Sequence, residues 1–325
     1  MKLATLKNGT PDGVLHVVSR DLTRSAPAVA APTMIAALER WSEVEAALLA
    51  QYEAVNAGAG EALDLGRAMA PLPRARQWLD GSAYDCHGDL MDKVFGLEKK
   101  DRKGRPLMYQ GVSDAFFGPY DDVRMVTEED YIDFEGEFGV LLDEVPLHAG
   151  PEEAARHIRL IVQINDWSLR RLAPIEMGTG FGWIQAKPPC SVAPVAVTPD
   201  ELGAAWRDCR VDLPLNVAWN GAAFGHANGY PMSAGFDELV AHAAYSRVLA
   251  AGTVIGSGTV SNETYREVGS SCIAERRGIE LIDLGEARTG YMSFGDTVRM
   301  EVALADGTPV FGPQEQRVVR ADGSL

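Results

Sequence analysis

The alternation of apolar and polar positions predicts a chain built mainly from strands, with one long helix near its start. Residues 1–20 contain two apolar runs around the turn sequence Asn8-Gly9, a pattern typical of a β-hairpin. Between residues 35 and 55, apolar side chains recur at steps of three and four, which predicts a single amphipathic helix. The prolines at 71 and 73 then indicate a linker. We therefore expect a small N-terminal α/β domain over residues 1–72.

Strand patterns dominate the remaining domain, residues 73–325. Aromatic and branched residues predict a strand over 131–142, and an apolar run predicts another over 158–165. A helix is expected over 235–250, and a closing hairpin over 294–312. Because regular helices do not separate the strands, the pattern favours an α+β fold with a mostly antiparallel core rather than a doubly wound sheet.

Composition and charge narrow the class of protein. The chain has 325 residues, 46% of them hydrophobic and 23% charged, as in ordinary soluble globular proteins. Its formal net charge of −16 argues against nucleic acid or an anionic membrane as a partner. It has no apolar run of about 18 residues that could span a membrane, and no signal-peptide pattern at its start. We expect a cytoplasmic protein.

The cysteines support that expectation. Cys86, Cys190, Cys209 and Cys272 are scattered along the sequence, without a CxxC pair or a metal-ligand spacing. Such a distribution is typical of reduced thiols in a cytosolic protein.

A pair of acidic residues within the predicted strand 131–142 indicates a site. Side chains two apart on a strand share a face, so Glu135 and Glu137 project together while Phe134 and Phe138 turn into apolar packing. Like charges this close need a cation or a Lys or Arg between them, unless the pair lies on a solvated edge. Asp166 follows the next apolar run, so gathered carboxylates could form a site for Mg²⁺ or Ca²⁺.

Several short motifs, taken together, resemble the fumarylacetoacetate hydrolase family. The resemblance covers residues 75–315, and the N-terminal segment looks like the extra domain of longer members. The run from Asn165 to Arg170, Asn-Asp-Trp-Ser-Leu-Arg, is the most specific of the motifs. The others are Asp80 followed by His87, Glu135-Gly136-Glu137, Lys187-Pro188, Gly256-Ser257-Gly258-Thr259 and Phe294-Gly295-Asp296.

The resemblance implies a mixed β-sandwich roll that works as a homodimer and uses a divalent metal, Mg²⁺ or else Ca²⁺ or Mn²⁺. The family's members hydrolyse a C–C bond in a 1,3-diketo acid such as fumarylacetoacetate or an acylpyruvate, as in aromatic amino acid catabolism. The expected partner is thus a small anionic keto acid. Hydratases, isomerases and oxaloacetate-type decarboxylases on the same scaffold are the alternative, and a non-catalytic metal-bound β-roll is a third possibility.

Roles in the site are implied by the matching positions. Metal ligands are expected at Asp80, Glu135, Glu137 and Asp166. His87 matches the general base and Glu275 the acid that orients it. Cations that hold substrate oxygens match Arg170 and Lys187, and further substrate contacts match Tyr109 and Thr259.

Two positions depart from the family pattern and leave the substrate open. Ala173 stands where a Gln is expected three residues after the Arg, and Ser82 replaces a Tyr. The spacing from Thr259 to Glu275 is about two residues longer than expected, and the charged loop 98–105 has no clear match.

Purely structural interpretations remain open for individual residues. Glu275 precedes two arginines, so it could be an ordinary salt-bridged surface residue. Lys187 before two prolines could lie in a solvent-facing turn. The glycines at 256 and 258 lack the spacing of a phosphate-binding loop, and instead suggest close backbone approach.

Overall fold

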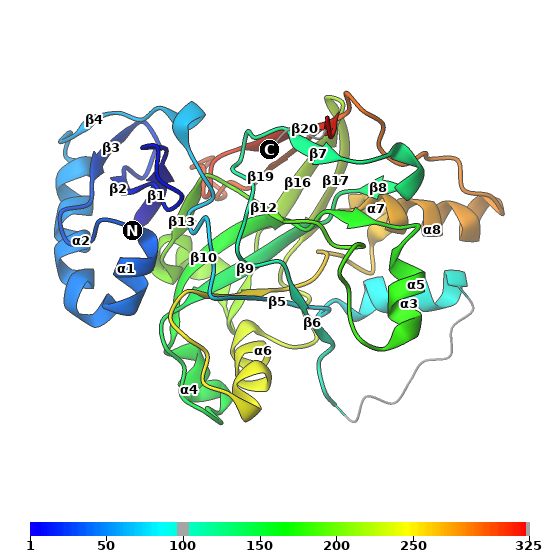
Figure 1. Ribbon diagram of the computed structural model, residues 1–325, viewed down its shortest axis with the longest axis horizontal. Coiled ribbons are helices and arrows are strands. Elements are labelled where there is room, and N and C mark those ends of the chain that lie inside the picture. The colour runs from blue at the N-terminus through cyan, green and yellow to red at the C-terminus, as the bar shows by residue number, and fades with distance from the viewer. Residues whose placement is uncertain (96–103, 323–325) are drawn as a thin grey trace.

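The computed structural model describes residues 1–95 and 104–322, and it confirms the N-terminal hairpin. Strands β1 (Lys2–Leu6) and β2 (Val14–Val18) pair antiparallel, and β3 (Arg24–Pro27) and β4 (Glu61–Ala62) extend the same sheet. Figure 1 shows this N-terminal layer at one side of the molecule, with its helices packed over the strands. Most of the predicted loop 98–105 lies outside the described residues.

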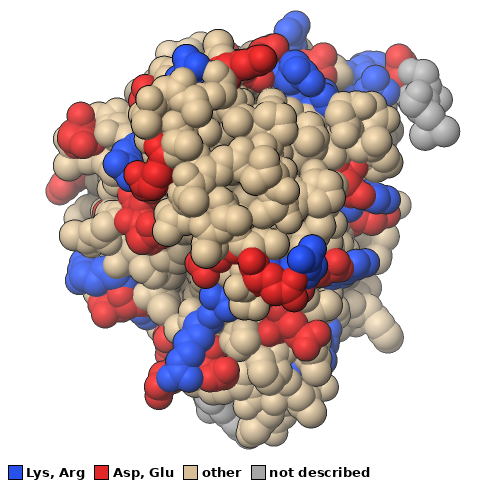
Figure 2. Space-filling view, turned by 90° about the vertical axis from the view of Figure 1, so that its left-hand side faces the viewer, with Lys and Arg blue, Asp and Glu red and all other residues tan. Residues whose placement is uncertain are grey.

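The predicted single helix over 35–55 is wrong in one respect, because the structure has two. Helix α1 (Met34–Glu39) ends before Arg40, whose φ of −132° and ψ of 31° are not helical, and α2 (Trp41–Asn56) starts directly after it. Both helices bury the same apolar stripe, so the periodicity does not register the break. Figure 2 shows the outer face of this layer as a broad area without Lys, Arg, Asp or Glu, with charges around its margin.

The larger sheet runs through both parts of the chain. Its strand order is β4-β3-β2-β1-β13-β10-β9-β18-β5-β6, with β12 also paired to β10. Only the β18–β5 pair along this path is parallel among the described residues. The bounds not yet given are β5 (Gln77–Gly81), β6 (Met108–Gly111), β9 (Gly136–Leu142), β10 (Ile158–Asn165), β12 (Ser191–Val192), β13 (Val195–Val197) and β18 (Thr253–Gly256).

A second sheet shares one apolar core with the larger one. Its order is β17-β16-β19-β20-β7, formed by β7 (Val123–Met125), β16 (Pro214–Trp219), β17 (Ala222–Asn228), β19 (Thr297–Glu301) and β20 (Gln314–Arg320). The predicted closing hairpin exists as β19 and β20, but its second strand begins at Gln314 instead of near residue 310. The mostly antiparallel α+β architecture is confirmed.

The predicted strand over 131–142 is broken where its acids begin. Tyr131 has a left-handed φ of 60°, and the next two residues form β8 (Ile132–Asp133), which pairs with β11 (Ser168–Leu169) outside the larger sheet. Strand β9 starts only at Gly136, so Glu135 lies in the gap between the two strands. Phe134 and Phe138 are both buried in the core, as expected.

Six helices follow the N-terminal pair in the described part of the chain. They are α3 (Asp85–Phe95), α4 (Pro151–Ala155), α5 (Ala173–Thr179), α6 (Phe236–Ala243), α7 (Tyr265–Val268) and α8 (Ile273–Leu284). The helix expected over 235–250 is shorter, because a 3₁₀ turn over 244–246 follows α6. Other 3₁₀ turns cover 65–67, 128–130 and 199–205, and β14 (Trp206–Arg207) pairs with β15 (Arg210–Val211). No helix within the described residues is long and apolar enough to cross a membrane.

Candidate active site

Three buried carboxylates from neighbouring strands of the larger sheet converge on one point. Asp80 lies on β5, Glu137 on β9, and Asp166 directly follows β10. One oxygen from each lies within 4.8 Å of the others. The pairing of β18 with both β5 and β9, and of β9 with β10, brings these distant positions together. We call Asp80, Glu137 and Asp166 the acid trio.

The negative charges of the acid trio repel one another, and one of the three carboxylates has no hydrogen-bond partner among the described residues. Both carboxylate oxygens of Glu137 are buried without a hydrogen-bond partner among the described residues. Burial raises the pKa of Glu137 well above its usual value, and the charges of Asp80 and Asp166 raise it further. Burial and Asp166 do the same to the pKa of Asp80. Crowded carboxyl oxygens of this kind fit a hard divalent cation, which would relieve their repulsion.

Two glycines give the backbone access to this point. A Cβ atom on Gly256 would lie 2.3 Å from Asp80 Oδ1 and 2.3 Å from the Trp78 ring. Gly258 has a φ of +80°, and its N–H donates to Asp80 Oδ1 at 3.1 Å. The expectation that these glycines permit close approach is therefore confirmed, with Asp80 as the group approached.

The fourth expected ligand, Glu135, is held by cations beside the acid trio. Lys187 Nζ donates to a carboxylate oxygen of Glu135 and to Asp166 Oδ2 at 2.5 Å. Arg170 Nη2 donates to Glu135 Oε1 at 2.6 Å. Burial opposes ionisation of Glu135, but Arg170 and Lys187 outweigh it and hold the pKa of this carboxyl well below its usual value.

Lys187 is buried, with 5% of its surface exposed, which rules out the solvent-facing turn. Burial alone would lower the pKa of this ammonium group, yet Asp166 and Glu135 more than compensate and raise it. Lys187 therefore stays charged and favours the ionised form of Glu135.

Asp133 is a site residue that the sequence reasoning missed. Its Oδ2 accepts from Arg170 Nε at 2.8 Å, and its carboxylate also accepts the N–H groups of Ile273 and Ala274 at the start of α8. The available signal was its position two residues before Glu135. Asp133 thus fixes Arg170 and the first turn of α8 relative to each other.

His87 and Glu275 are brought together from α3 and α8. His87 Nδ1 lies 3.4 Å from Glu275 Oε2, and Ser261 Oγ donates to Glu275 Oε1 at 2.6 Å. Glu275 is fully buried, so it is not a surface salt-bridge residue. The predicted pairing of the histidine with this acid is present despite the longer spacing in the sequence.

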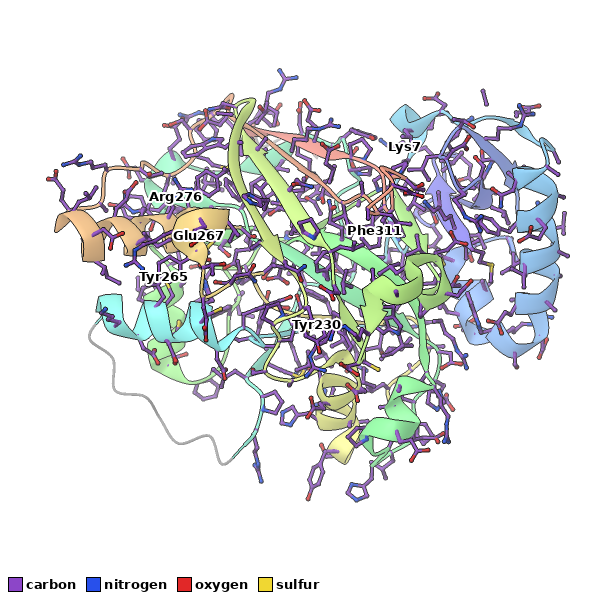
Figure 3. The ribbon with its side chains drawn as sticks, turned by 180° about the vertical axis from the view of Figure 1, so that it is seen from behind. Lys7, Tyr230, Tyr265, Glu267, Arg276 and Phe311 are labelled. Carbon is purple, nitrogen blue, oxygen red and sulfur yellow. The ribbon has the colours of Figure 1, made fainter. Side chains whose placement is uncertain are left out.

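Helix α8 is also anchored to β17 through Arg276. Figure 3 shows α8 lying along α3, with Arg276 on α8 labelled. Arg276 Nη2 donates to the Phe224 carbonyl at 2.9 Å, and its guanidinium lies 4.9 Å from the centroid of that ring. These contacts hold the turn that carries Glu275.

Tyr109 and Trp183 form the wall between the acid trio and a cavity. Tyr109 OH donates to Asp166 Oδ2 at 2.6 Å, and its ring centroid lies 4.9 Å from that of Trp183. The cavity, of about 790 Å³, is large enough for a small organic acid. Its basic lining residues within the described chain are Arg105, His242 and Arg247.

Three further residues, Thr259, Trp183 and Cys190, lie at or near the site, and the sequence indicated a role for only the first. Thr259 is buried and directly follows Gly258, in line with its expected place near the site. Trp183 follows the glycine-rich run 178–182, whose sequence alone indicates no role. Cys190 Sγ donates to Asp166 Oδ1 at 2.9 Å, a contact that no spacing in the sequence indicates.

Comparisons with known proteins identify the class. Residues 76–319 match the sequence model described as fumarylacetoacetate (FAA) hydrolase C-terminal, and residues 1–74 match fumarylacetoacetase N-terminal domain 2. The chain belongs to the fumarylacetoacetate hydrolase family, and carries its additional N-terminal domain.

Individual relatives are distant. The chain is 29% identical to 2,4-didehydro-3-deoxy-L-rhamnonate hydrolase of Sphingomonas sp. (strain SKA58) over 157 residues, 47% of this chain and 52% of that protein. The match thus spans about half the length of this relative. The structure of maleylpyruvate hydrolase from Sphingobium sp. SYK-6, with manganese(II) and pyruvate, is similar at a TM-score of 0.67 and 17% identity, covering 99% of this chain and 100% of that one.

An isomerase shares the same fold. The structure of 2-hydroxyhepta-2,4-diene-1,7-dioate isomerase from Mycobacterium marinum superposes with a TM-score of 0.55 at 20% identity, covering 81% of this chain and 82% of that one. The expected fold and family are confirmed, while the roles of individual residues stay predictions.

Proposed function

We propose that this protein is a divalent-metal-dependent hydrolase that cleaves a C–C bond in a 1,3-diketo acid, such as an acylpyruvate or fumarylacetoacetate. The observation that carries the proposal is the acid trio, with the buried and unpartnered carboxylate of Glu137 at its centre. The two named hydrolases among the relatives, one of a dehydrogenated sugar acid and one seen with manganese and pyruvate, support the same class of chemistry.

The ion would be held by Asp80, Glu137 and Asp166, with Glu135 as the proposed fourth ligand, and Mg²⁺ is the proposed metal, with Mn²⁺ a close substitute. When bound, it supplies Lewis-acid polarisation of the substrate carbonyls and charge that makes a carbon leaving group tolerable. Lys187 and Arg170 keep Glu135 ionised beside this point, so the local charge stays suited to a cation.

His87 is the proposed general base. Its Nδ1 faces the buried carboxylate of Glu275, which leaves Nε2 to take a proton from water. Glu275, itself fixed by Ser261, orients the ring and stabilises the imidazolium that forms. The imidazolium then returns the proton to the departing carbon.

The substrate is proposed to enter through the cavity next to Tyr109 and Trp183. Arg170 and Lys187 are proposed to contact the oxygens of the substrate, and Tyr109 and Thr259 are proposed as further substrate contacts. The two arginines along the cavity suit an anionic acid, although the protein as a whole carries a charge of −16. Assembly as a homodimer and a place in aromatic catabolism remain predictions from the family resemblance.

The test is the loss of diketo-acid absorbance when purified protein is mixed with an acylpyruvate, with and without Mg²⁺. Hydrolysis that depends on the metal and is lost in His87→Ala supports the proposal. His226→Ala, which removes an exposed histidine on β17, is the matched control and should leave the rate unchanged.

Two outcomes would contradict the proposal. Full hydrolytic activity in His87→Ala would remove the assigned base. Decarboxylation or isomerisation without hydrolysis would favour the alternative activities on this scaffold, which the isomerase among the structural relatives also exemplifies.

A further inference from the structure

A second group of potential ligands lies next to the acid trio and differs from it in chemistry. Atoms of His87, Cys272 and Glu275 lie within 4.8 Å of one another. His87 comes from α3, whereas Cys272 is the N-cap of α8 and Glu275 lies in its first turn. The group is buried except for His87, which is 15% exposed and gives a path from solvent.

The donor set of this group is nitrogen, sulfur and carboxylate oxygen. Zn²⁺ binds such sets, typically with three protein ligands and a fourth position for water where the site is open. Soft thiolate ligands select Zn²⁺ over Mg²⁺, which prefers the all-oxygen acid trio. The two groups are thus suited to different ions.

Cys272 lies at the start of α8, and a bound metal would have to displace its thiol proton, because burial and the charge of Asp133 raise the pKa of this thiol. Its Sγ accepts the Glu275 N–H at 3.3 Å, at the N-terminus of a helix of 12 residues. The positive end of the helix dipole stabilises negative charge there. Arg170 is the nearby cation, and its charge would repel a bound metal ion. This repulsion is largely offset because Arg170 is already paired with Asp133 and Glu135.

We propose that His87, Cys272 and Glu275 form a binding site for Zn²⁺ or a similar thiophilic divalent ion. When the metal ion binds, it takes the place of the thiol proton of Cys272, and this proton passes to solvent. It also occupies the imidazole and its acid partner, so the ion blocks general-base catalysis and inhibits the enzyme. The binding claim stands on geometry alone, whereas the inhibition rests on the proposed function.

Binding is tested with Co²⁺ as a spectroscopic probe in the Glu137→Gln variant, which disables the acid trio. A thiolate-to-cobalt absorption band that saturates at one equivalent of Co²⁺ is expected, and Zn²⁺ should abolish it. The band should vanish in Glu137→Gln with Cys272→Ser, because serine preserves the helix cap but not the soft ligand.

Cys190→Ser in the same background is the matched control, since Cys190 is the buried thiol beside Asp166. The band should persist there. Glu137→Gln with His87→Ala offers a second variant that leaves the cap of α8 untouched, and it should also lose the band. Absence of the band in the Glu137→Gln parent, or its persistence without Cys272, would overturn the proposed site.

Inhibition is tested separately, by titrating Zn²⁺ into the diketo-acid assay at saturating Mg²⁺. Relative to each variant's own uninhibited rate, Cys272→Ser should need roughly tenfold more Zn²⁺ or beyond for half inhibition. Equal sensitivity in the two proteins would contradict the blocking role. A wild-type protein that shows no hydrolysis would contradict the proposed function. The cobalt band would still show whether His87, Cys272 and Glu275 bind a metal ion.

Discussion

Replacing Glu137 with Gln should remove the stabilisation of the fold by divalent metal without harming the metal-free protein. The substitution keeps the shape of the side chain and removes the carboxylate that has no partner in the described structure. Because Asp80 and Asp166 repel a charge at this position, the neutral amide should be tolerated at least as well as the acid. The metal, by contrast, loses a central ligand.

The size of the expected Tm shift follows from the linkage between metal binding and folding. A metal at 100 times its dissociation constant stabilises the folded state by about 2.7 kcal/mol. An unfolding entropy of about 2.1 cal/mol/K per residue gives about 0.7 kcal/mol/K for the 325 residues. The wild-type Tm should therefore rise by about 4 °C with saturating Mg²⁺ or Mn²⁺. Glu137→Gln should show a shift close to zero.

The assay is thermal unfolding of both proteins, first treated with a chelator and then titrated with metal. Glu45→Gln is the matched control, because it removes the same charge from the exposed face of α2. It should keep the full metal-dependent shift. A Glu137→Gln protein that retains the wild-type shift would refute the assignment of the acid trio.

Three further predictions concern the base, the backbone and pH. His87→Ala should lower kcat for diketo-acid hydrolysis by about 10²- to 10⁴-fold while the metal-dependent Tm shift persists; an unchanged kcat would contradict its role. Gly256→Ala should destabilise the fold by about 1–3 kcal/mol in denaturant unfolding, because its Cβ would lie 2.3 Å from Asp80 Oδ1, whereas Gly290→Ala, with open space around it, should be near neutral. Burial lowers the pKa of Lys2 to about 8 from an ordinary 10.5, against the pull of Glu201. Between these pH values the unfolded state binds more protons, so the stability of wild type relative to Lys2→Met should rise by up to about 3 kcal/mol, and a flat difference would refute this.

Hydrophobic patterning placed Glu137 and Asp166 near strand ends, whereas the resemblance to the family supplied the expected positions of Asp80, His87 and Lys187. Glu137 and Asp166 could be placed next to each other from two apolar runs alone. Patterning could not show that Glu135 lies just outside strand β9 and contacts Arg170 and Lys187. That outcome depends on Arg170 and Lys187 returning from later parts of the chain, which no local pattern encodes.

The absence of tertiary contacts from local sequence patterns also explains the predictions that were wrong or missed. The break at Arg40 leaves one continuous apolar stripe, so a periodicity argument reads two helices as one. The cysteines looked inert because their partners are distant in the sequence: Cys190 meets Asp166, and Cys272 meets His87 across two helices. Tertiary contacts, rather than spacing, give these thiols their chemistry.

The central claim is that Asp80, Glu137 and Asp166 bind one divalent ion. Crystals grown with Mn²⁺ and measured at wavelengths on both sides of the manganese absorption edge test it directly. We expect one anomalous peak within ligand distance of all three carboxylates, and no such peak in crystals of Glu137→Gln. Ordered carboxylates without such a peak at saturating Mn²⁺ would contradict it.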